Sequence, residues 1–296
     1  MRTILNSRGA LFVALALSSG IALSGCSNPS SSDHPTVVVS YSVLGDVVSQ
    51  LVGDAADVRV IIPNGVDPHE FEPSAKNVEA INNATLIVVN GANLEEHLIR
   101  IFEQASQSGV PLFEMVDHLT TRSRTVDGTE TIDPHLWLDP MAIYQAIPDL
   151  AGELGARLNI DLASRASQVQ QDLADLNSDV AAIISSIRNC TLITGHDEMG
   201  YFAARYGCTV IGAIIPGLST SAEATAGQIA NLKQSASAAG VDAIFVDAGA
   251  SAQVAGQLAR ELDVELVVLS THMLESGDHY REFILRISNL IATALN

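Results

Sequence analysis

One long amphipathic segment in the middle of the chain, residues 161–188, constrains the fold more than any other stretch. Its apolar residues recur at spacings of four and three, so they share one face of a helix. These residues are Val169, Leu173, Leu176, Val180, Ile183 and Ile187. A helix of about 28 residues would be roughly 42 Å long. This helix is too long for one small lobe and predicts a connection along two lobes, whereas its stripe is too short to require coiled-coil pairing.

Short apolar segments alternate with helical segments on both sides of this helix. Four strands are expected before it, at 36–40, 58–63, 85–90 and 111–115, and four after it, at 191–194, 209–215, 243–246 and 264–269. The other expected helices lie at 46–52, 74–81, 94–106, 140–158, 196–206, 221–239, 251–261 and 279–295. The alternation is typical of parallel sheets that helices cover on both faces. We expect an α/β fold of two lobes, each a four-stranded parallel sheet with flanking helices, joined by a long rigid helix.

Two connecting segments have local signals of their own. Residues 118–134 are dominated by Thr, Ser, Arg, Gly and Asp without an apolar repeat, which predicts an exposed loop. Thr220-Ser221-Ala222-Glu223 has the spacing of a capping box and predicts the start of the helix at 221–239.

The N-terminus has the pattern of a secretion signal. Arg2 and Arg8 accompany an apolar segment, 11–23, that is too short for a comfortable membrane span. Leu-Ser-Gly-Cys at 23–26 resembles a bacterial lipobox, which implies cleavage before Cys26 and lipidation of its sulfur; a plain signal peptide with a chance cysteine is the alternative. The expected division is a signal peptide at 1–25, a flexible tether at 26–35, an N-terminal lobe at 36–158, a linking helix at 159–189 and a C-terminal lobe at 190–296.

The charge and the remaining cysteines set further limits. The formal net charge is −19, which argues against nucleic acid as a partner and favours the approach of cations, although solubility alone also accounts for it. Cys190 and Cys208 lie at the starts of successive expected strands. In an oxidising compartment a disulfide between them and two unpaired, buried cysteines are both compatible with the sequence.

The tripeptide Asp-Pro-His occurs twice, at 67–69 and 133–135. Proline fixes its own φ and keeps the preceding Asp out of helical space, so each histidine is presented from a stiff turn. A stiff turn suits a metal ligand, because an imidazole must meet its ion within a few tenths of an ångström. One copy alone would be an ordinary turn before a helix. The second copy and a third histidine, His196, favour a metal site.

Four candidate ligands follow strand ends, where ligands bind in open parallel sheets. They are His69, His135, His196 and Asp278, two from each lobe, so the site is expected between the lobes. Three imidazoles and one carboxylate complete a tetrahedral shell that suits Zn²⁺. Asp67, Asp133 and Asp197 adjoin the histidines and are candidates to orient them. His118, His272 and His279 lie near the site loops, with a structural role as the default, and His97 is expected on a helix surface.

Three sequence strings carry a resemblance to a known family. They are GVDPHEFEPS at 65–74, DPHLWLDP at 133–140 and GHDEMGYF at 195–202, with GDHY at 277–280 as a weaker fourth. The chain resembles the metal-binding, lipoprotein-adhesin-type solute-binding proteins of bacterial ABC importers for zinc or manganese. The resemblance implies two α/β lobes bridged by a rigid helix and one metal between them. It implies His69, His135, His196 and Asp278 as the four ligands.

The resemblance also bears on the substrate and the partners. Similar proteins with His at the third position tend to bind zinc and those with Glu tend to bind manganese, which agrees with the preference of imidazole for zinc. His196 therefore favours Zn²⁺, with a manganese receptor as the alternative. The loop at 118–134 offers only His118, so capture by a His-rich loop is not expected. The expected partners are an ABC permease with its ATPase, and loading by a metallochaperone is left open. We expect a monomer, anchored outside the cytoplasmic membrane through Cys26, at the cell surface or in the periplasm.

Two other functions, a zinc hydrolase and an adhesin, are less compatible with the sequence. A zinc hydrolase usually keeps three protein ligands and an open water position, so four ligands and the lack of an evident general base argue against an enzyme and no catalytic residue is expected. The hydrolase would gain ground if Asp278 were not a ligand. An adhesin is suggested only by the names of some similar proteins, because nothing in the sequence indicates a partner surface.

Overall fold

A computed structural model describes residues 34–126, 128–247 and 252–296, and Cys26 with the expected signal segment lies outside this range. Within the described residues, none of the helices combines the length and the apolar character that a membrane crossing needs.

The N-terminal lobe is built on a four-stranded parallel sheet in the order β2-β1-β3-β4. Its strands are β1 (Thr36–Tyr41), β2 (Asp57–Ile62), β3 (Leu86–Val89) and β4 (Leu112–Glu114), and its helices are α1 (Ser42–Val52), α2 (Ala75–Asn82) and α3 (Ile99–Gln107). The short helix η1 (Gly53–Ala55) follows α1. Val37, Val38 and Val39 are fully buried, because helices cover both faces of a parallel sheet.

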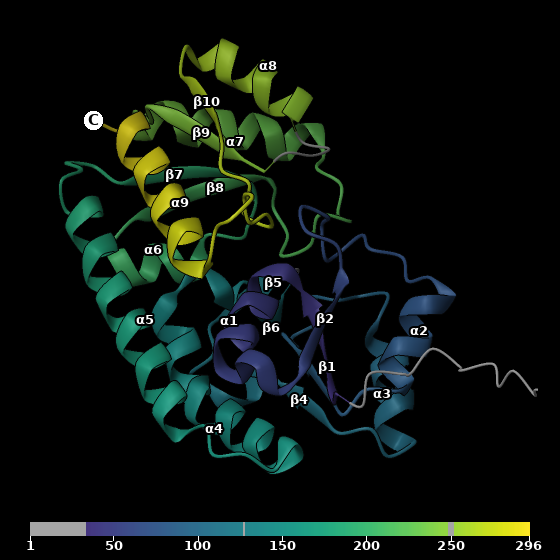
Figure 1. The fold of residues 1–296 in the computed structure, drawn as a ribbon. Coiled ribbons are helices and arrows are strands. Elements are labelled where there is room, and N and C mark those ends of the chain that lie inside the picture. Colours follow the sequence, from purple (N-terminus) through teal and green to yellow (C-terminus); the bar gives the residue numbers. More distant parts are fainter. Residues whose placement is uncertain (1–33, 127, 248–251) are drawn as a thin grey trace, which may run out of the picture. The chain divides into compact units, whose positions relative to one another are not determined.

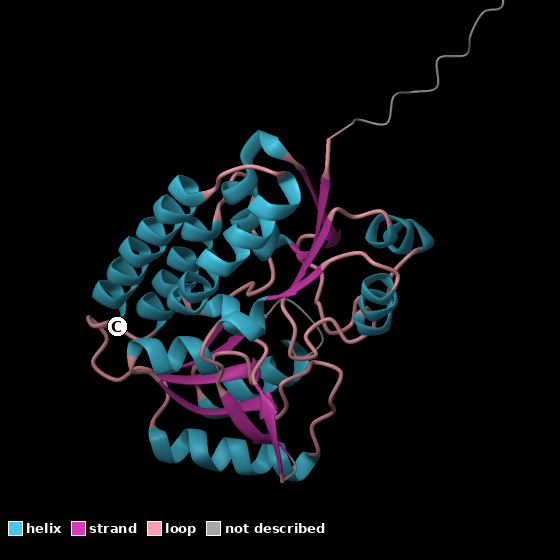
Figure 2. Ribbon diagram, turned by 90° about the horizontal axis from the view of Figure 1, so that it is seen from below, coloured by secondary structure: helices cyan, strands magenta, loops and turns pink. Residues whose placement is uncertain are grey.

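The C-terminal lobe repeats this architecture, with a four-stranded parallel sheet in the order β10-β9-β7-β8. Its strands are β7 (Thr191–His196), β8 (Thr209–Ile215), β9 (Ala243–Val246) and β10 (Glu265–Val268), and its helices are α6 (Gly200–Tyr206), α7 (Ala226–Ala239), α8 (Ala252–Leu262) and α9 (Tyr280–Ala294). Cys190 and Cys208 precede β7 and β8 and form a disulfide with a Cα–Cα distance of 4.7 Å. The two sheets appear as separate magenta groups in Figure 2, so the expected two-lobe α/β fold is confirmed.

Two helices lie between the two sheets along the chain, and the second of them contacts both lobes. They are α4 (Pro140–Leu158) and α5 (Ala163–Ile184), and α5 runs along one side of both lobes (Figure 1). It packs against α4 and α1 of the N-terminal lobe and against α9 and α6 of the C-terminal lobe. It has 22 residues, fewer than the expected segment 161–188, because it begins at Ala163 and ends at Ile184, before the C-cap residue Ser185. One hydrophobic core continues from the first sheet through α4 and α5 to α9, and a smaller core lies where α7 and α8 cover the second sheet.

The loop expected at 118–134 is wrong in its middle part. After the short helix η2 (Met115–His118), the chain forms an antiparallel hairpin of β5 (Ser123–Val126) and β6 (Thr129–Ile132). β-Branched residues are frequent in both strands, and Gly128 has a φ of 81° at the turn. The sequence Asp127-Gly128 is a hairpin signal that the apolar repeat alone does not detect.

The capping box expected at Thr220 is also wrong. α7 begins at Ala226, and its capping box pairs Thr225 with Gln228 through backbone-to-side-chain hydrogen bonds of 2.8 and 3.2 Å. The Thr220 hydroxyl instead donates to Asp67 of the other lobe at 2.6 Å. α6 likewise begins at Gly200, because His196 is still part of β7. α3 begins at Ile99, after turns that follow β3.

Candidate metal centre

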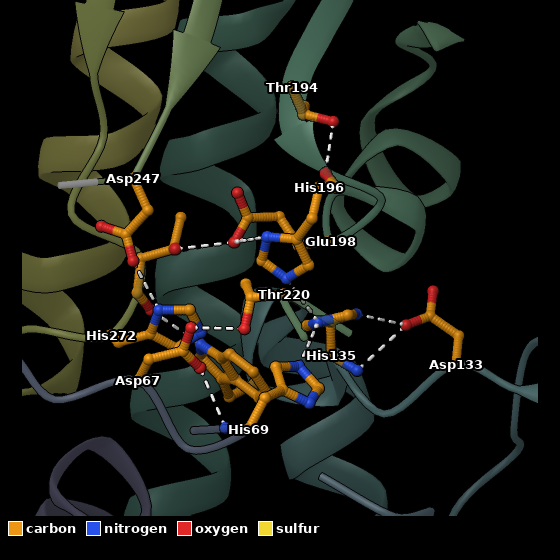
Figure 3. Close-up of polar contacts among 12 residues, drawn as sticks. Asp67, His69, Asp133, His135, Thr194, His196, Glu198, Thr220, Asp247 and His272 are labelled. Atoms are coloured by element: carbon orange, nitrogen blue, oxygen red, sulfur yellow. Dashed lines mark hydrogen bonds and ion pairs between the residues drawn. The ribbon is translucent and has the colours of Figure 1, made fainter. Parts of the chain in front are cut away.

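Three histidines from three separate segments converge between the lobes (Figure 3). His69 follows β2, His135 precedes the short helix η3 (Leu136–Leu138), and His196 is the last residue of β7. Their exposed fractions are 1, 0 and 2%. The Nε2 atom of His135 lies 3.4 Å from that of His69 and 3.0 Å from that of His196. Tetrahedral Zn²⁺ with Zn–N bonds of 2.0–2.1 Å would separate its nitrogens by roughly 3.3 Å, so this spacing fits the ion.

The protonation of these rings favours metal binding. Burial lowers the pKa of His135 well below its usual value, and the nearby His69 and His272 lower it further. Burial also lowers the pKa of His196, with His135 as the next cause. Both rings are therefore neutral at physiological pH, and a neutral imidazole is the form that binds a metal.

Asp133 orients the ring of His135. Its Oδ1 atom accepts from the His135 backbone N–H at 3.0 Å and lies 2.8 Å from His135 Nδ1. With the Nδ1 proton held there, the Nε2 lone pair faces the other two histidines, as in metal-ligating histidines generally. Burial raises the pKa of Asp133 to about 6. The expected contact between Asp133 and its histidine is present.

Asp67 holds only the backbone of its histidine. Its Oδ1 accepts from the His69 N–H at 2.9 Å, while its Oδ2 accepts from the Thr220 hydroxyl. The Nδ1 atom of His69 instead lies 3.3 Å from Glu96 Oε1, without hydrogen-bond geometry. The imidazole of His69 lowers the pKa of Glu96. Glu96 was not found from the sequence, because it lies far from both Asp-Pro-His turns along the chain.

His196 faces Glu198 rather than the adjacent Asp197. The Oε2 atom of Glu198 lies 3.8 Å from His196 Nδ1 and accepts from the Thr271 hydroxyl at 2.7 Å. Glu198 is 1% exposed, and burial raises its pKa to about 8. Asp197 forms an ion pair with Arg124 of β5, so the hairpin of one lobe contacts the other lobe beside the site. Asp197 as a partner of the His196 ring is therefore a wrong expectation, because its side chain points to the hairpin.

Asp278 is not brought to the three histidines. Its backbone N–H closes a turn onto the Glu275 carbonyl just before α9, and its Oδ2 lies 3.7 Å from Arg286 Nε. Among the described residues, it belongs to no group of three potential ligands with atoms within 4.8 Å of one another. The turn before α9 directs the Asp278 side chain toward that helix, so its position in the loop after β10 does not bring it to the histidines.

His272 lies beside the cluster instead. It is 6% exposed and forms a second group of potential ligands with His196 and Glu198, all within 4.8 Å. Its Nδ1 lies 2.5 Å from Asp247 Oδ2. Burial acts to lower the pKa of His272, but the hydrogen bond and charge of Asp247, together with the charges of Glu198 and Asp67, raise it above its usual value. The sequence signal for His272 was its position just after β10, closer to the strand end than Asp278.

The other histidines lie away from this centre. His97, His118 and His279 are paired with Glu72, Asp149 and Asp46, at 3.3, 2.9 and 2.7 Å respectively. The structural role that was the default for His118 and His279 agrees with these contacts.

Two α/β lobes with a buried ligand cluster between them define the class of two-lobed solute-binding proteins. The family described as ZnuA, zinc-uptake complex component A, periplasmic, matches residues 37–294, and the chain belongs to this family. Proteins of this family are extracytoplasmic receptors that work with the permease and ATPase components of ABC importers, and they are not enzymes.

Individual relatives include receptors named for different metals. The chain is 29% identical over 217 residues to the manganese-binding lipoprotein MntA of Halalkalibacterium halodurans, covering 71% of this chain and 70% of the relative. It is 27% identical over 258 residues to the high-affinity zinc uptake system protein ZnuA of Bacillus subtilis, covering 82% and 80%. Among solved structures, the periplasmic zinc-binding protein TroA of Treponema pallidum matches with a TM-score of 0.77 at 22% identity, covering 88% of this chain and 99% of that one.

Proposed function

We propose that this protein captures Zn²⁺ outside the cytoplasmic membrane and delivers it to an ABC permease. The observation that supports this function is the convergence of three buried imidazole nitrogens, with adjacent Nε2 atoms 3.0 and 3.4 Å apart. These nitrogens lie within hydrogen-bond distance of one another, and a bound cation would replace such contacts by ligation of all three rings. His69, His135 and His196 are the proposed ligands.

Zinc is proposed over manganese because of the donor atoms. The relatives include proteins named for manganese and for zinc at nearly equal identity, so similarity alone does not choose between the two ions. Three imidazoles suit Zn²⁺, whereas Mn²⁺ is bound better by carboxylate and carbonyl oxygens. Glu198, the buried carboxylate next to the cluster, accepts a hydrogen bond from Thr271 and is not among the proposed ligands.

The remaining parts of the proposal concern organisation and location. We propose an N-terminal lobe at 36–158, a linking segment at 159–189 that contains α5, and a C-terminal lobe at 190–296. A lipid anchor at Cys26 is supported by the lipobox-like sequence and by a similar protein that is named a lipoprotein. A monomer is supported by the origin of all three histidines in one chain. Loading by a metallochaperone stays a prediction.

Metal analysis and competition titration test this function. Protein without its signal segment, purified without added metal, is expected to carry zinc and to bind one equivalent, with zinc preferred to manganese. His135→Ala is expected to weaken zinc binding by about 100-fold or more, because the free energy of zinc binding is shared among few ligands.

The control is His97→Ala, which removes a half-exposed histidine away from the site. Equal zinc affinity of the His135→Ala variant and the wild type would contradict the site. A wild type that prefers manganese would leave the site in place and change the substrate.

A further inference from the structure

His272 has a buried ring nitrogen without a partner. Its Nε2 atom makes no hydrogen bond, although the side chain is only 4% exposed. Buried polar atoms are nearly always paired, so an unpaired nitrogen beside a cluster of potential metal ligands calls for a partner. We infer that His272 is the fourth ligand of the transported metal and that the site is made of four imidazoles. This inference rests on the proposed function.

The other nitrogen of His272 is held as it is in a metal-ligating histidine. Asp247 directly follows β9, and its Oδ2 lies 2.5 Å from His272 Nδ1. A proton at Nδ1 is shared with this carboxylate, so the lone pair of the neutral ring lies at Nε2. The same arrangement holds His135, whose Nδ1 lies 2.8 Å from Asp133. Both rings thus have a carboxylate at Nδ1, and the Nε2 atom faces the other two histidines in His135 and has no partner in His272 (Figure 3).

The ring of His272 packs directly against the cluster. It is nearly parallel to the ring of His196, at 18° and with centroids 6.1 Å apart. The centroid of the Trp137 ring lies 5.5 Å from that of His272 and 5.4 Å from that of His135. The four histidines do not form one group with all ligand atoms within 4.8 Å of one another. Ligation by all four therefore requires a shift of the His272 loop or of the other rings.

The loop that carries His272 is fastened to the opposite lobe. The Asn64 side chain exchanges two hydrogen bonds with the backbone of Leu274, at 2.6 and 2.8 Å. The Gly65 N–H donates to the His272 carbonyl at 3.3 Å, and the Trp137 indole donates to the Thr271 carbonyl at 3.0 Å. The same loop is held by its own lobe through the contact of His272 with Asp247 and the hydrogen bond from Thr271 to Glu198, so it joins the two lobes beside the site.

A four-imidazole site has consequences for selectivity. All four donors would be neutral nitrogens, and the carboxylates of Asp133 and Asp247 would lie behind the rings without touching the ion. Such a set favours zinc and other borderline ions and disfavours Mn²⁺ more strongly than three imidazoles with one carboxylate. His272 would then be a specificity-determining ligand.

X-ray absorption at the zinc edge of the wild-type protein, loaded with one equivalent, tests the ligand set directly. Four imidazole nitrogens at about 2.0–2.1 Å are expected. Three imidazoles with one oxygen would overturn the inference, and the one-equivalent zinc binding would still support the proposed function. Failure of the wild type to bind zinc at all would overturn both.

Variants separate His272 from Asp278. His272→Ala is expected to weaken zinc binding at least about tenfold, comparable with or larger than the effect of disturbing a ligand's outer partner. Asp278→Asn is the matched control at the other loop position, and it is expected to change zinc affinity by less than about twofold, as for a surface ion pair. His272→Asp is expected to retain zinc binding and to narrow the gap between zinc and manganese.

Circular dichroism melting without metal reports whether each variant is folded, and the absorption experiment needs no variant. A loss of zinc affinity in Asp278→Asn with none in His272→Ala would overturn the inference. Wild-type affinity in both variants would also overturn it, because the metal would then have three protein ligands.

Discussion

The two Asp-Pro-His turns share their sequence and one hydrogen bond within the turn but differ in the other contacts of the aspartate side chain. In both turns the Oδ1 atom accepts from the N–H of the histidine, at 2.9 Å from Asp67 and 3.0 Å from Asp133. Asp133 also contacts the ring of His135, whereas the other oxygen of Asp67 binds Thr220 across the lobe boundary. One turn therefore orients a ligand ring, and the other joins two lobes.

This difference shows that the tripeptide determines the turn and the surroundings determine its use. The hydrogen bond from the histidine N–H to Oδ1 depends only on an aspartate two residues earlier in the chain. It is a short-range contact that proline stabilises. The contact of the second oxygen depends on which chain segment packs there. At Asp67 this segment is the connection after β8, which contains Thr220. The Asp133 side chain is instead buried, near Arg122 and beside the His135 ring.

The largest effect that would sharpen this comparison is on stability. The pKa of Asp133 rises from 3.8 to about 6 on folding, because the carboxylate is buried. The folded state therefore binds the proton more tightly, and the contribution of this group to stability is fully present below 3.8 and is lost as the pH rises through 6. In metal-free protein at about pH 7.5, Asp133→Asn is expected to raise the free energy of unfolding by up to about 3 kcal/mol.

Urea denaturation at about pH 7.5 and below pH 4 measures this gain, which is expected to disappear at the acid pH. A gain of the same size at both pH values would show that ionisation of Asp133 is not its cause.

The next effect is on zinc affinity, where the two aspartates should differ. Asp133→Asn is expected to weaken zinc binding by about 10- to 100-fold, because an amide orients the His135 ring and raises its basicity less than a carboxylate does. Asp67→Asn is the matched control from the other turn and is expected to have a smaller effect, since Asp67 does not contact the His69 ring. Competition with a chromophoric chelator at fixed pH measures both. Equal losses in the two variants would remove the functional difference between the turns.

The smallest effect concerns the contact between the lobes. Thr220→Val removes the hydroxyl that donates to Asp67 at 2.6 Å and is expected to cost about 1.5 kcal/mol in unfolding free energy, the lower end for a hydrogen bond to a charged group, because this contact is only partly buried. Because the two residues share one contact, the effects of Thr220→Val and Asp67→Asn are expected to be non-additive. A double-mutant cycle by urea denaturation measures the coupling, and strict additivity would mean that the contact contributes nothing.

Much of the fold could be predicted, because its signals are local. The alternation of apolar strands and helices predicted both parallel sheets, and the bounds of β8 and β9 agree with the expected ones. The errors lie where local patterns compete. The capping box forms at Thr225 and not at the similar sequence that begins at Thr220, whose hydroxyl donates to Asp67. The hairpin of β5 and β6 has too few apolar residues for periodicity to detect it.

The candidate site was predicted in part, because some of its signals are also local. His69, His135 and His196 each follow a strand or a stiff turn, so their convergence between the lobes follows from the topology. Asp278 and His272 both follow β10, and although His272 lies closer to the strand end, this position alone does not establish which of them faces the histidines. The turn before α9 and the contact with Arg286 direct Asp278 elsewhere, whereas Asp247 holds His272 beside His196.

The sequence by itself determined the two parallel sheets, the helices between them and the stiff turns that present two of the histidines, because each depends on residues close together along the chain. Asp133 was expected beside His135, and only the tertiary structure decided the other partners of the rings: Glu96 near His69, Glu198 rather than Asp197 near His196, and Asp247 for His272. Asp133 and Glu198 lie two residues from their histidines, whereas Glu96 and Asp247 are distant in sequence from theirs. Their distances are set by how the two lobes and α5 pack, and no local pattern contains that information.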